Sequence, residues 1–180
     1  MRLYCGIDLH SNNSVVAILD EQDRVVYQER LSNDLELILQ ELSPYKERLQ
    51  GIVVESTYNW YWLVDGLMEA GFMVHLANTA AIIQYEGLKY SDDNHDARWL
   101  AHLLRLGILK VGYIYPKEER SLRDLLRKRS QMVRQRTAQM LSIQNLYARN
   151  SAERKTANQV RNMVAADIDQ DTGEIHLNMA

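Results

Sequence analysis

Three strand-forming segments lie within the first 29 residues of this 180-residue chain. Residues 3–8, 14–19 and 25–29 are rich in apolar and β-branched side chains, and the polar links at 9–13 and 20–24 are short enough to be hairpin turns. Hairpin links join antiparallel strands. We therefore expect the chain to begin as an antiparallel three-stranded meander.

Helices and strands alternate after this meander. We expect a helix at 35–42 capped by Ser32 or Asn33, a strand ending at Glu55, a helix at 59–70 and a strand at 72–76. A strand, a helix and a second strand in this order form a parallel pair with a right-handed crossover. The two parts together predict an α/β fold with a mixed sheet and flanking helices.

The rest of the chain is predicted to be mainly helical. We expect a short helix from Asn78 to Tyr85, a polar loop at 86–92, a helix from Asp93 to Gly107 and a short strand at 111–115. Residues 117–149 contain neither Gly nor Pro, and their apolar residues recur at heptad spacing, although Arg129 and Arg136 interrupt the seam. This pattern predicts a long coiled-coil-like helix.

Charge is distributed unevenly along the chain. Residues 1–116 carry 9 Lys and Arg against 16 Asp and Glu, whereas residues 117–155 carry 11 against 4. An acidic domain followed by a basic helix favours a polyanionic partner, with nucleic acid first, although a solvated helix surface would also explain the basic residues. We expect three parts: a globular domain at 1–115, the long basic helix at 116–150 and a flexible polar tail at 151–180.

Composition excludes two classes of protein. Cys5 is the single cysteine, so no intrachain disulfide can form, and we expect it to pack in the core of an intracellular protein. The N-terminus has no secretion signal, and no stretch approaches the roughly 20 apolar residues needed to cross a bilayer. We expect a soluble, cytoplasmic protein with no membrane partner.

Four acidic residues stand where a metal-dependent nuclease needs them. Asp8 and Glu55 end two buried strands, and Asp93 and Asp96 share one face at the start of a helix. Buried carboxylates are costly unless a cation pairs with them, and Mg²⁺ takes oxygen ligands. The element order is that of an RNase H-like domain, in which the first and fourth strands are neighbours. In that arrangement the four carboxylates can hold two Mg²⁺ ions roughly 4 Å apart for phosphodiester cleavage.

Each acidic residue also has a simpler interpretation when it is taken alone. Asp93 or Asp96 could cap the helix, Asp8 could end its strand, and Glu55 could pair with a basic residue, either Lys89 or Arg98. The occurrence of all four on the elements that one fold brings together favours the joint interpretation.

Four motifs stand out in the sequence. They are Gly6-Ile7-Asp8-Leu9-His10, Val54-Glu55-Ser56-Thr57, Asp93-Asn94-His95-Asp96-Ala97 preceded by Lys89, and Ser121-Leu122-Arg123-Asp124-Leu125. These motifs resemble those of the DEDD transposases of bacterial insertion sequences. This family is similar to the Piv/MooV-type DNA invertases and, in its N-terminal domain, to the RuvC Holliday-junction resolvase.

The resemblance covers about residues 1–150 and implies an RNase H-like (RuvC-like) fold. It implies that the catalytic and metal-binding tetrad consists of Asp8, Glu55, Asp93 and Asp96. The cofactor it implies is Mg²⁺, with Mn²⁺ as a substitute and two ions in the site. It further implies a nucleoid-associated bacterial protein that binds DNA and a structured bridge RNA and forms a homo-oligomer through the long helix.

The sequence departs from the family pattern in two places. Ser91 and Asp92 occupy the stretch where the family usually has Thr, so Asp92 competes with Asp93 as a metal ligand. Family members also have a C-terminal domain that supplies a serine nucleophile, and nothing after Arg149 resembles that domain. We therefore expect this chain to be a fragment or a truncated copy, which could be inactive alone.

Other polar residues carry weaker signals. Candidates for phosphate contacts on the long helix are Arg123, Arg127, Lys128, Arg129, Arg134 and Arg136. We interpret His10 as an ordinary loop histidine, with an approach to substrate phosphate as the alternative. Asp167, Asp169 and Asp171 do not complete a calcium loop, and the histidines have no zinc spacing with Cys5.

The predicted function is the catalytic N-terminal part of a DNA transposase or recombinase that cleaves and transfers DNA strands with Mg²⁺. Two alternatives stay open: a stand-alone RuvC-like junction-resolving nuclease, and a non-catalytic module for nucleic-acid binding or oligomerisation. An actin-like ATP-binding domain also begins with Gly-Ile-Asp, but this chain has no glycine-rich phosphate loop and is short for two such lobes.

Overall fold

The computed structural model of the protein describes residues 1–82, 93–152 and 154–164. The chain divides into two compact units, one at 1–114 and the other at 115–180. Each unit is described by itself below. Among the described residues, no helix is both long enough and apolar enough to cross a membrane.

The first unit begins with the predicted meander. Its strands are β1 (Leu3–Leu9), β2 (Asn13–Leu19) and β3 (Val25–Ser32). They pair antiparallel in this order. The backbone N–H of His10 donates to the Asn13 carbonyl at 2.9 Å and closes the first turn, and that of Asp20 donates to the Arg24 carbonyl at 3.0 Å and closes the second.

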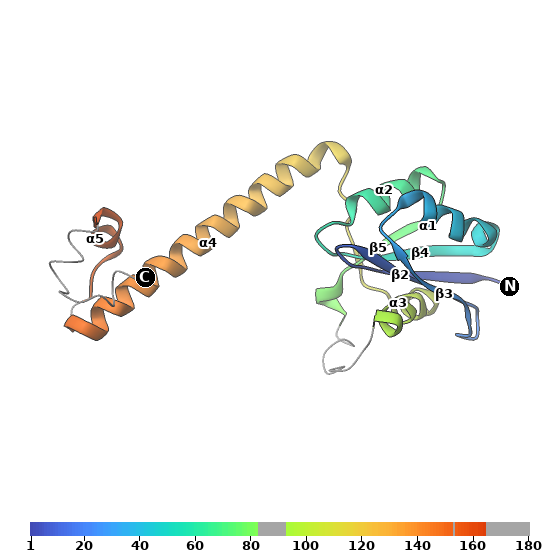
Figure 1. Cartoon of the computed structure of the whole chain (residues 1–180), viewed down its shortest axis with the longest axis horizontal. Helices are drawn as coiled ribbons and strands as arrows, with labels where there is room; N and C mark the ends of the chain where they lie inside the picture. Colours follow the sequence, from blue (N-terminus) through green and yellow to red (C-terminus); the bar gives the residue numbers. More distant parts are fainter. Residues whose placement is uncertain (83–92, 153, 165–180) are drawn as a thin grey trace. The chain divides into compact units, whose positions relative to one another are not determined.

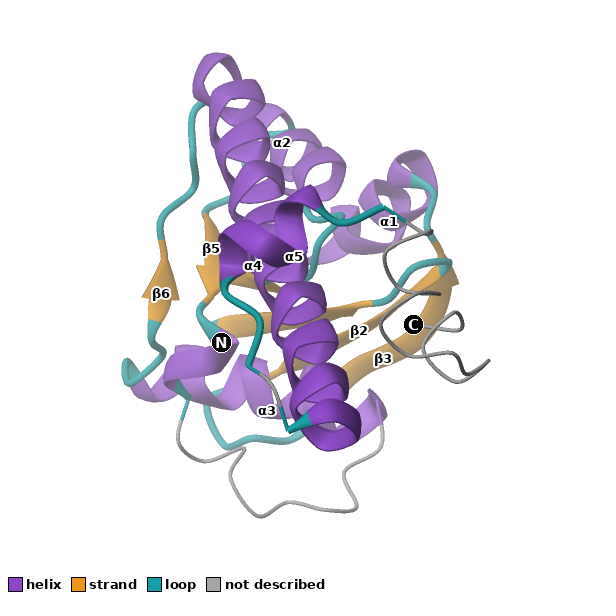
Figure 2. Cartoon of the chain, turned by 90° about the vertical axis from the view of Figure 1, so that its left-hand side faces the viewer, coloured by secondary structure: helices purple, strands orange, loops and turns teal. Residues whose placement is uncertain are grey.

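Three further strands complete a mixed sheet. They are β4 (Leu49–Glu55), β5 (Val74–Ala77) and β6 (Val111–Gly112). The described residues form a six-stranded sheet in the order β3-β2-β1-β4-β5-β6, with β6 as an edge strand (Figure 2). Strand β4 is parallel to β1 and to β5. The sheet has the RNase H-like arrangement predicted from the sequence, with strands one and four adjacent at its centre.

Helices cover both faces of this sheet (Figure 1). One face carries α1 (Leu35–Leu42), the 3-10 helix η1 (Ser43–Arg48) and α2 (Tyr61–Glu69), whereas the other face carries α3 (Asp93–Leu106). The main apolar core lies under α1 and α2, where Ile38 and Leu63 pack with Ile7 and Val54. Cys5 is buried in this core, and burial raises the pKa of its thiol.

Local details differ from the sequence predictions. The cap of α1 is Asp34 rather than Ser32 or Asn33, because the Asp34 carboxylate accepts from the backbone N–H groups of Glu36 and Leu37. Only the 3-10 turn η2 (Thr79–Ala81) is described from the short helix predicted at 78–85, and the predicted loop at 86–92 lies outside the described residues.

The second unit contains the predicted long helix, α4 (Lys117–Ser151). The sequence did not predict the short helix α5 (Ala157–Asn162), which follows a left-handed residue, Ala152. A capping box between Thr156 and Gln159 begins α5, and the helix contacts α4. Val160 of α5 and Tyr147 of α4 are both buried.

Candidate active site

Asp8 and Glu55 lie side by side on the face of the sheet that α3 covers. In the parallel pairing of β1 with β4, Gly6 is opposite Val53 and Ile7 is opposite Val54, so Asp8 and Glu55 are the next pair in register. Side chains alternate between the faces of a strand. Val53 packs with residues of α3, so both carboxylates, each two residues further along its strand, face α3 as well.

Gly6 allows α3 to approach the sheet closely. A Cβ atom at this position would overlap the backbone carbonyl of Ala97 and come within 2.7 Å of the Ala101 nitrogen. Only glycine leaves the backbone of α3 this near to β1. This contact brings the first turn of α3, with Asp93 and Asp96, close to the end of β1 where Asp8 lies.

The geometry gives Glu55 an unusual affinity for a proton. Burial, a hydrogen bond with the Asp8 side chain and the negative charges of Asp8 and Asp96 raise the pKa of Glu55 to about 8. Asp8 itself is buried, with 4% of its side chain exposed. Asp8, Glu55 and Asp96 therefore form one electrostatically coupled group of carboxylates.

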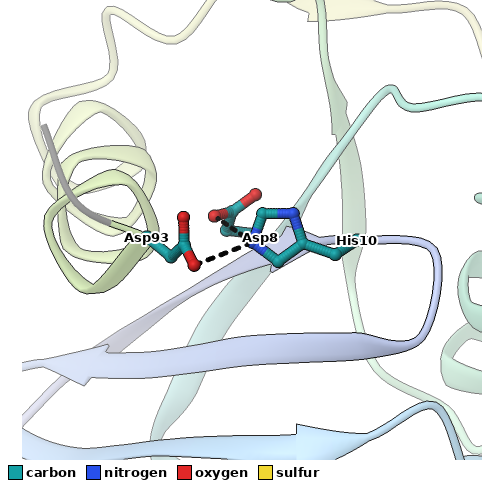
Figure 3. Close-up of side chains that lie close together, drawn as sticks. All are labelled: Asp8, His10 and Asp93. Carbon is teal, nitrogen blue, oxygen red and sulfur yellow. Dashed lines mark ion pairs between the residues drawn. The ribbon is translucent and has the colours of Figure 1, made fainter.

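Asp93 is held on a different side of this group. Its Oδ2 atom lies 2.6 Å from Nη2 of Arg30 and 3.3 Å from Nε2 of His10. The same His10 nitrogen lies 3.2 Å from Oδ2 of Asp8, so the imidazole stands between the two carboxylates (Figure 3). The hydrogen bond from Arg30 is the main reason why the pKa of Asp93 is below its usual range.

The position of His10 was not foreseen from the sequence. We interpreted this residue as an ordinary loop histidine, whereas the structure places its side chain inside the acidic cluster. The tight turn between β1 and β2 returns the chain immediately after Asp8, which directs His10 toward the same end of the sheet. Its separation of two residues from Asp8 was the one available signal.

One simpler interpretation paired Glu55 with Arg98 or Lys89. Arg98 donates from Nε to the Asn94 carbonyl at 3.1 Å. Lys89, the other predicted partner of Glu55, lies outside the described residues, as does Asp92, the predicted competitor of Asp93. The structure thus brings Asp8, Glu55 and Asp96 together and links Asp93 to Asp8 through His10.

This set of groups suits a divalent cation. It offers several carboxylate oxygens, the donor atoms that Mg²⁺ and Mn²⁺ prefer. Burial and the negative charges of Asp8 and Asp96 raise the pKa of Glu55 to about 8, so the three carboxylates repel one another and would be stabilised by added positive charge. A divalent ion would supply that charge and remove the repulsion among Asp8, Glu55 and Asp96.

The candidate phosphate contacts lie on α4 in the second unit. The structure separates them into one half-buried and five exposed residues. Arg123 is the half-buried one: its guanidinium lies 4.7 Å from the centre of the Tyr115 ring and 3.1 Å from Asp124. The exposed ones are Arg127, Lys128, Arg129, Arg134 and Arg136.

Helical spacing divides four of these arginines between two faces of α4. Residues seven positions apart share a face, so Arg127 and Arg134 form one pair, which we call the polar-face pair. Arg129 and Arg136, which we call the seam pair, lie about half a turn away on the face that carries the exposed apolar side chains of the heptad seam. The two pairs therefore allow separate tests of nucleic-acid binding and of helix association.

The sequence profile of a DEDD family described as "Transposase" matches residues 5–148. No curated protein matches the sequence.

Two solved structures of RuvC are similar to this chain. One, from T. thermophilus and in complex with a Holliday junction substrate, is 15% identical, with a TM-score of 0.46 over 62% of this chain and 100% of that one. The other, from Thermus thermophilus, is 14% identical, with a TM-score of 0.42 over 61% of this chain and 99% of that one.

Proposed function

Because the chain belongs to the DEDD transposase family, we propose that it is the catalytic part of a transposase that cleaves and transfers DNA strands with Mg²⁺. One observation carries the proposal: the register of β1 with β4 makes Asp8 and Glu55 neighbours, and the close approach of α3 at Gly6 brings Asp96 to the same end of the sheet. Carboxylates brought together in this way are typical of metal-dependent phosphodiester chemistry.

Each of the four carboxylates has its own part in this proposal. Asp8 is the central ligand, since it contacts Glu55 on one side and, through His10, Asp93 on the other. Glu55 and Asp96 complete the set. When bound, a pair of Mg²⁺ ions activates the attacking oxygen and stabilises the leaving oxygen of a phosphodiester.

Two ionisable residues, Glu55 and Arg30, set the state of the site before a metal ion binds. Glu55 retains a proton near neutral pH and has to release it in order to become a ligand, so metal binding is expected to strengthen as pH rises toward 8. Arg30 fixes Asp93 by a 2.6 Å ion pair and keeps its carboxylate ionised. Arg30 also donates to the Asn13 side chain at 2.6 Å, which ties Asp93 to the β1–β2 turn.

The second unit supplies the proposed contacts with partners. Arg127 and Arg134, on the polar face of α4, are exposed and suited to bind DNA phosphates, and a structured guide RNA is a second ligand with the same backbone chemistry. Exposed apolar side chains at Leu122, Leu126 and Val133 follow the heptad seam and favour association with a second copy.

A DNA-cleavage assay tests the proposed function. The protein should nick DNA in the presence of Mg²⁺ or Mn²⁺, and Asp8→Asn should reduce the rate at least about 100-fold. The matched control is Asp34→Asn, because Asn is as good a helix cap as Asp and the fold is preserved. Cleavage that survives Asp8→Asn, or that needs no divalent ion, would contradict the proposal.

A further inference from the structure

Three hydrogen bonds hold the backbone of His10 in place. Its carbonyl oxygen accepts from Nδ2 of Asn33 and from Nδ2 of Asn59, both at 3.0 Å, and its N–H donates to the Asn13 carbonyl at 2.9 Å. A carbonyl oxygen has two lone pairs, and both are used here by amides from separate segments of the chain. Side chains from outside the β1–β2 turn therefore fix the backbone of His10.

The two amides are themselves oriented by hydroxyl groups. Ser14 donates from Oγ to Oδ1 of Asn33 at 2.6 Å, and Thr57 donates from Oγ1 to Oδ1 of Asn59 at 2.9 Å. Each amide thus has its oxygen occupied and its NH₂ group directed at His10. An ordinary exposed loop residue does not need such a network. We therefore infer that the function requires a fixed position for the His10 side chain.

The Nε2 atom of the imidazole lies at a position that suits a metal ligand. This atom is buried from solvent, although 35% of the side chain is exposed, and it faces two carboxylate oxygens. Nε2 lies 3.2 Å from Oδ2 of Asp8 and 3.3 Å from Oδ2 of Asp93. Adjacent ligands of an octahedral ion, each roughly 2.1 Å from it, are about 3 Å apart, so the separation of Nε2 from each of these two oxygens is close to that of neighbouring ligands.

We propose that His10 supplies a nitrogen ligand to one metal ion held by Asp8 and Asp93, and that this position consequently favours transition ions such as Mn²⁺ over Mg²⁺. The inference rests on the proposed metal site and adds a fifth residue to its four carboxylates. Mg²⁺ is a hard ion that takes oxygen ligands, whereas an imidazole nitrogen binds transition ions more strongly. The position formed by Asp8, His10 and Asp93 is therefore selective for transition ions, and the remaining carboxylates form a second position with oxygen ligands only.

Electron paramagnetic resonance of bound Mn²⁺ tests the inference without an activity assay. The full chain loaded with Mn²⁺ alone should show electron spin-echo modulation from a directly bound ¹⁴N nucleus. Protein labelled with ¹⁵N only in histidine should show the ¹⁵N pattern instead, which assigns the ligand to a histidine without any substitution. Mn²⁺ that binds without nitrogen modulation would overturn the role of His10.

A pair of histidine variants identifies which histidine is bound. His10→Gln should abolish the modulation and weaken Mn²⁺ binding at least about tenfold, while Mg²⁺ affinity changes less than about threefold. The matched control is His102→Gln, because His102 pairs with Asp23 at 2.9 Å near the other end of α3. Modulation that persists in His10→Gln would refute the proposal.

The same experiment separates failure of this inference from failure of the proposed function. If Mn²⁺ binds and Asp8→Asn abolishes its binding, the metal site stands, and the nitrogen modulation alone decides the role of His10. If Mn²⁺ does not bind the unsubstituted protein, both the site and the inference fail. The histidine labelling gives an answer even if His10→Gln does not fold.

Discussion

Substitution of Glu55 by Gln should make the metal-free protein more stable at alkaline pH. The folded protein raises the pKa of Glu55 from 4.5 to about 8, because the half-buried carboxyl lies beside Asp8 and Asp96. Between these two pH values the folded state binds more protons than the unfolded state, so the free energy of unfolding falls as pH rises. A neutral Gln does not ionise, and its contribution stays constant over this range.

The size of the effect follows from the pKa shift. A shift of about 3.5 units, at 1.36 kcal/mol per unit, sets an upper limit of about 5 kcal/mol. Glu55 is only half-buried, so solvent screening reduces the expected gain to about 1–2 kcal/mol above pH 8. Below pH 4.5 Glu55 is protonated in both states, and the substitution should change stability little.

Urea unfolding followed by tryptophan fluorescence measures this difference. All three tryptophans lie in residues 1–114, so the signal reports on the unit that contains Glu55. The free energies of unfolding with metal chelated should diverge between pH 5 and 9, and saturating Mn²⁺ should reverse the order because only the unsubstituted protein keeps the full ligand set. The control is Glu47→Gln, at an exposed position.

A Glu55→Gln protein that is equally or less stable at pH 9 would refute the reasoning. It would mean that Glu55 is not crowded by other carboxylates, because a carboxylate in ordinary solvent gains nothing from losing its charge. A difference that does not vary with pH would have the same meaning, since it would reflect packing rather than ionisation.

Three further predictions test other parts of the structure. Gly6→Ala should lower the free energy of unfolding by about 1–3 kcal/mol and weaken Mn²⁺ binding, because the added methyl group overlaps the Ala97 carbonyl. The control is Gly112→Ala, where the added Cβ lies 3.6 Å from its nearest neighbour and should change neither quantity. Urea unfolding measures the stability, and calorimetric titration measures the binding. Replacing the polar-face pair by Ala should lower the slope of log affinity for DNA against log salt by about 2, and an unchanged slope, or an equal change from the seam pair, would remove that face from phosphate contact. Asp34→Ala should destabilise the first unit by about 1 kcal/mol through loss of the α1 cap, and thermal unfolding that matches the unsubstituted protein would contradict this role.

Much of the fold could be predicted because its signals are local. The apolar runs and short links at residues 3–29 define the meander, and the alternation that follows defines the parallel strands. Adjacency of β1 and β4 then follows from the element order, and it brings Asp8 and Glu55 together across 46 intervening residues. Periodicity and element order, together with the known strand arrangement of RNase H-like domains, were sufficient for this part of the site.

Other features depend on side-chain geometry that a pattern does not encode. Asn33 was expected to cap α1, but its amide holds the His10 carbonyl, and Asp34 caps the helix instead. The contact of Arg30 with Asp93 needs β3 to continue beyond the predicted end at residue 29, as it does to Ser32. Such contacts arise from the packing of segments distant in sequence, so they become visible only in three dimensions.

A crystal of the protein soaked in MnCl₂ gives the most direct test of the central claim. Anomalous scattering should show at least one manganese peak within coordination distance of the Asp8 carboxylate, with Glu55, Asp93 or Asp96 among its other ligands. A fully occupied manganese site elsewhere on the molecule, with no peak beside Asp8, would contradict the account.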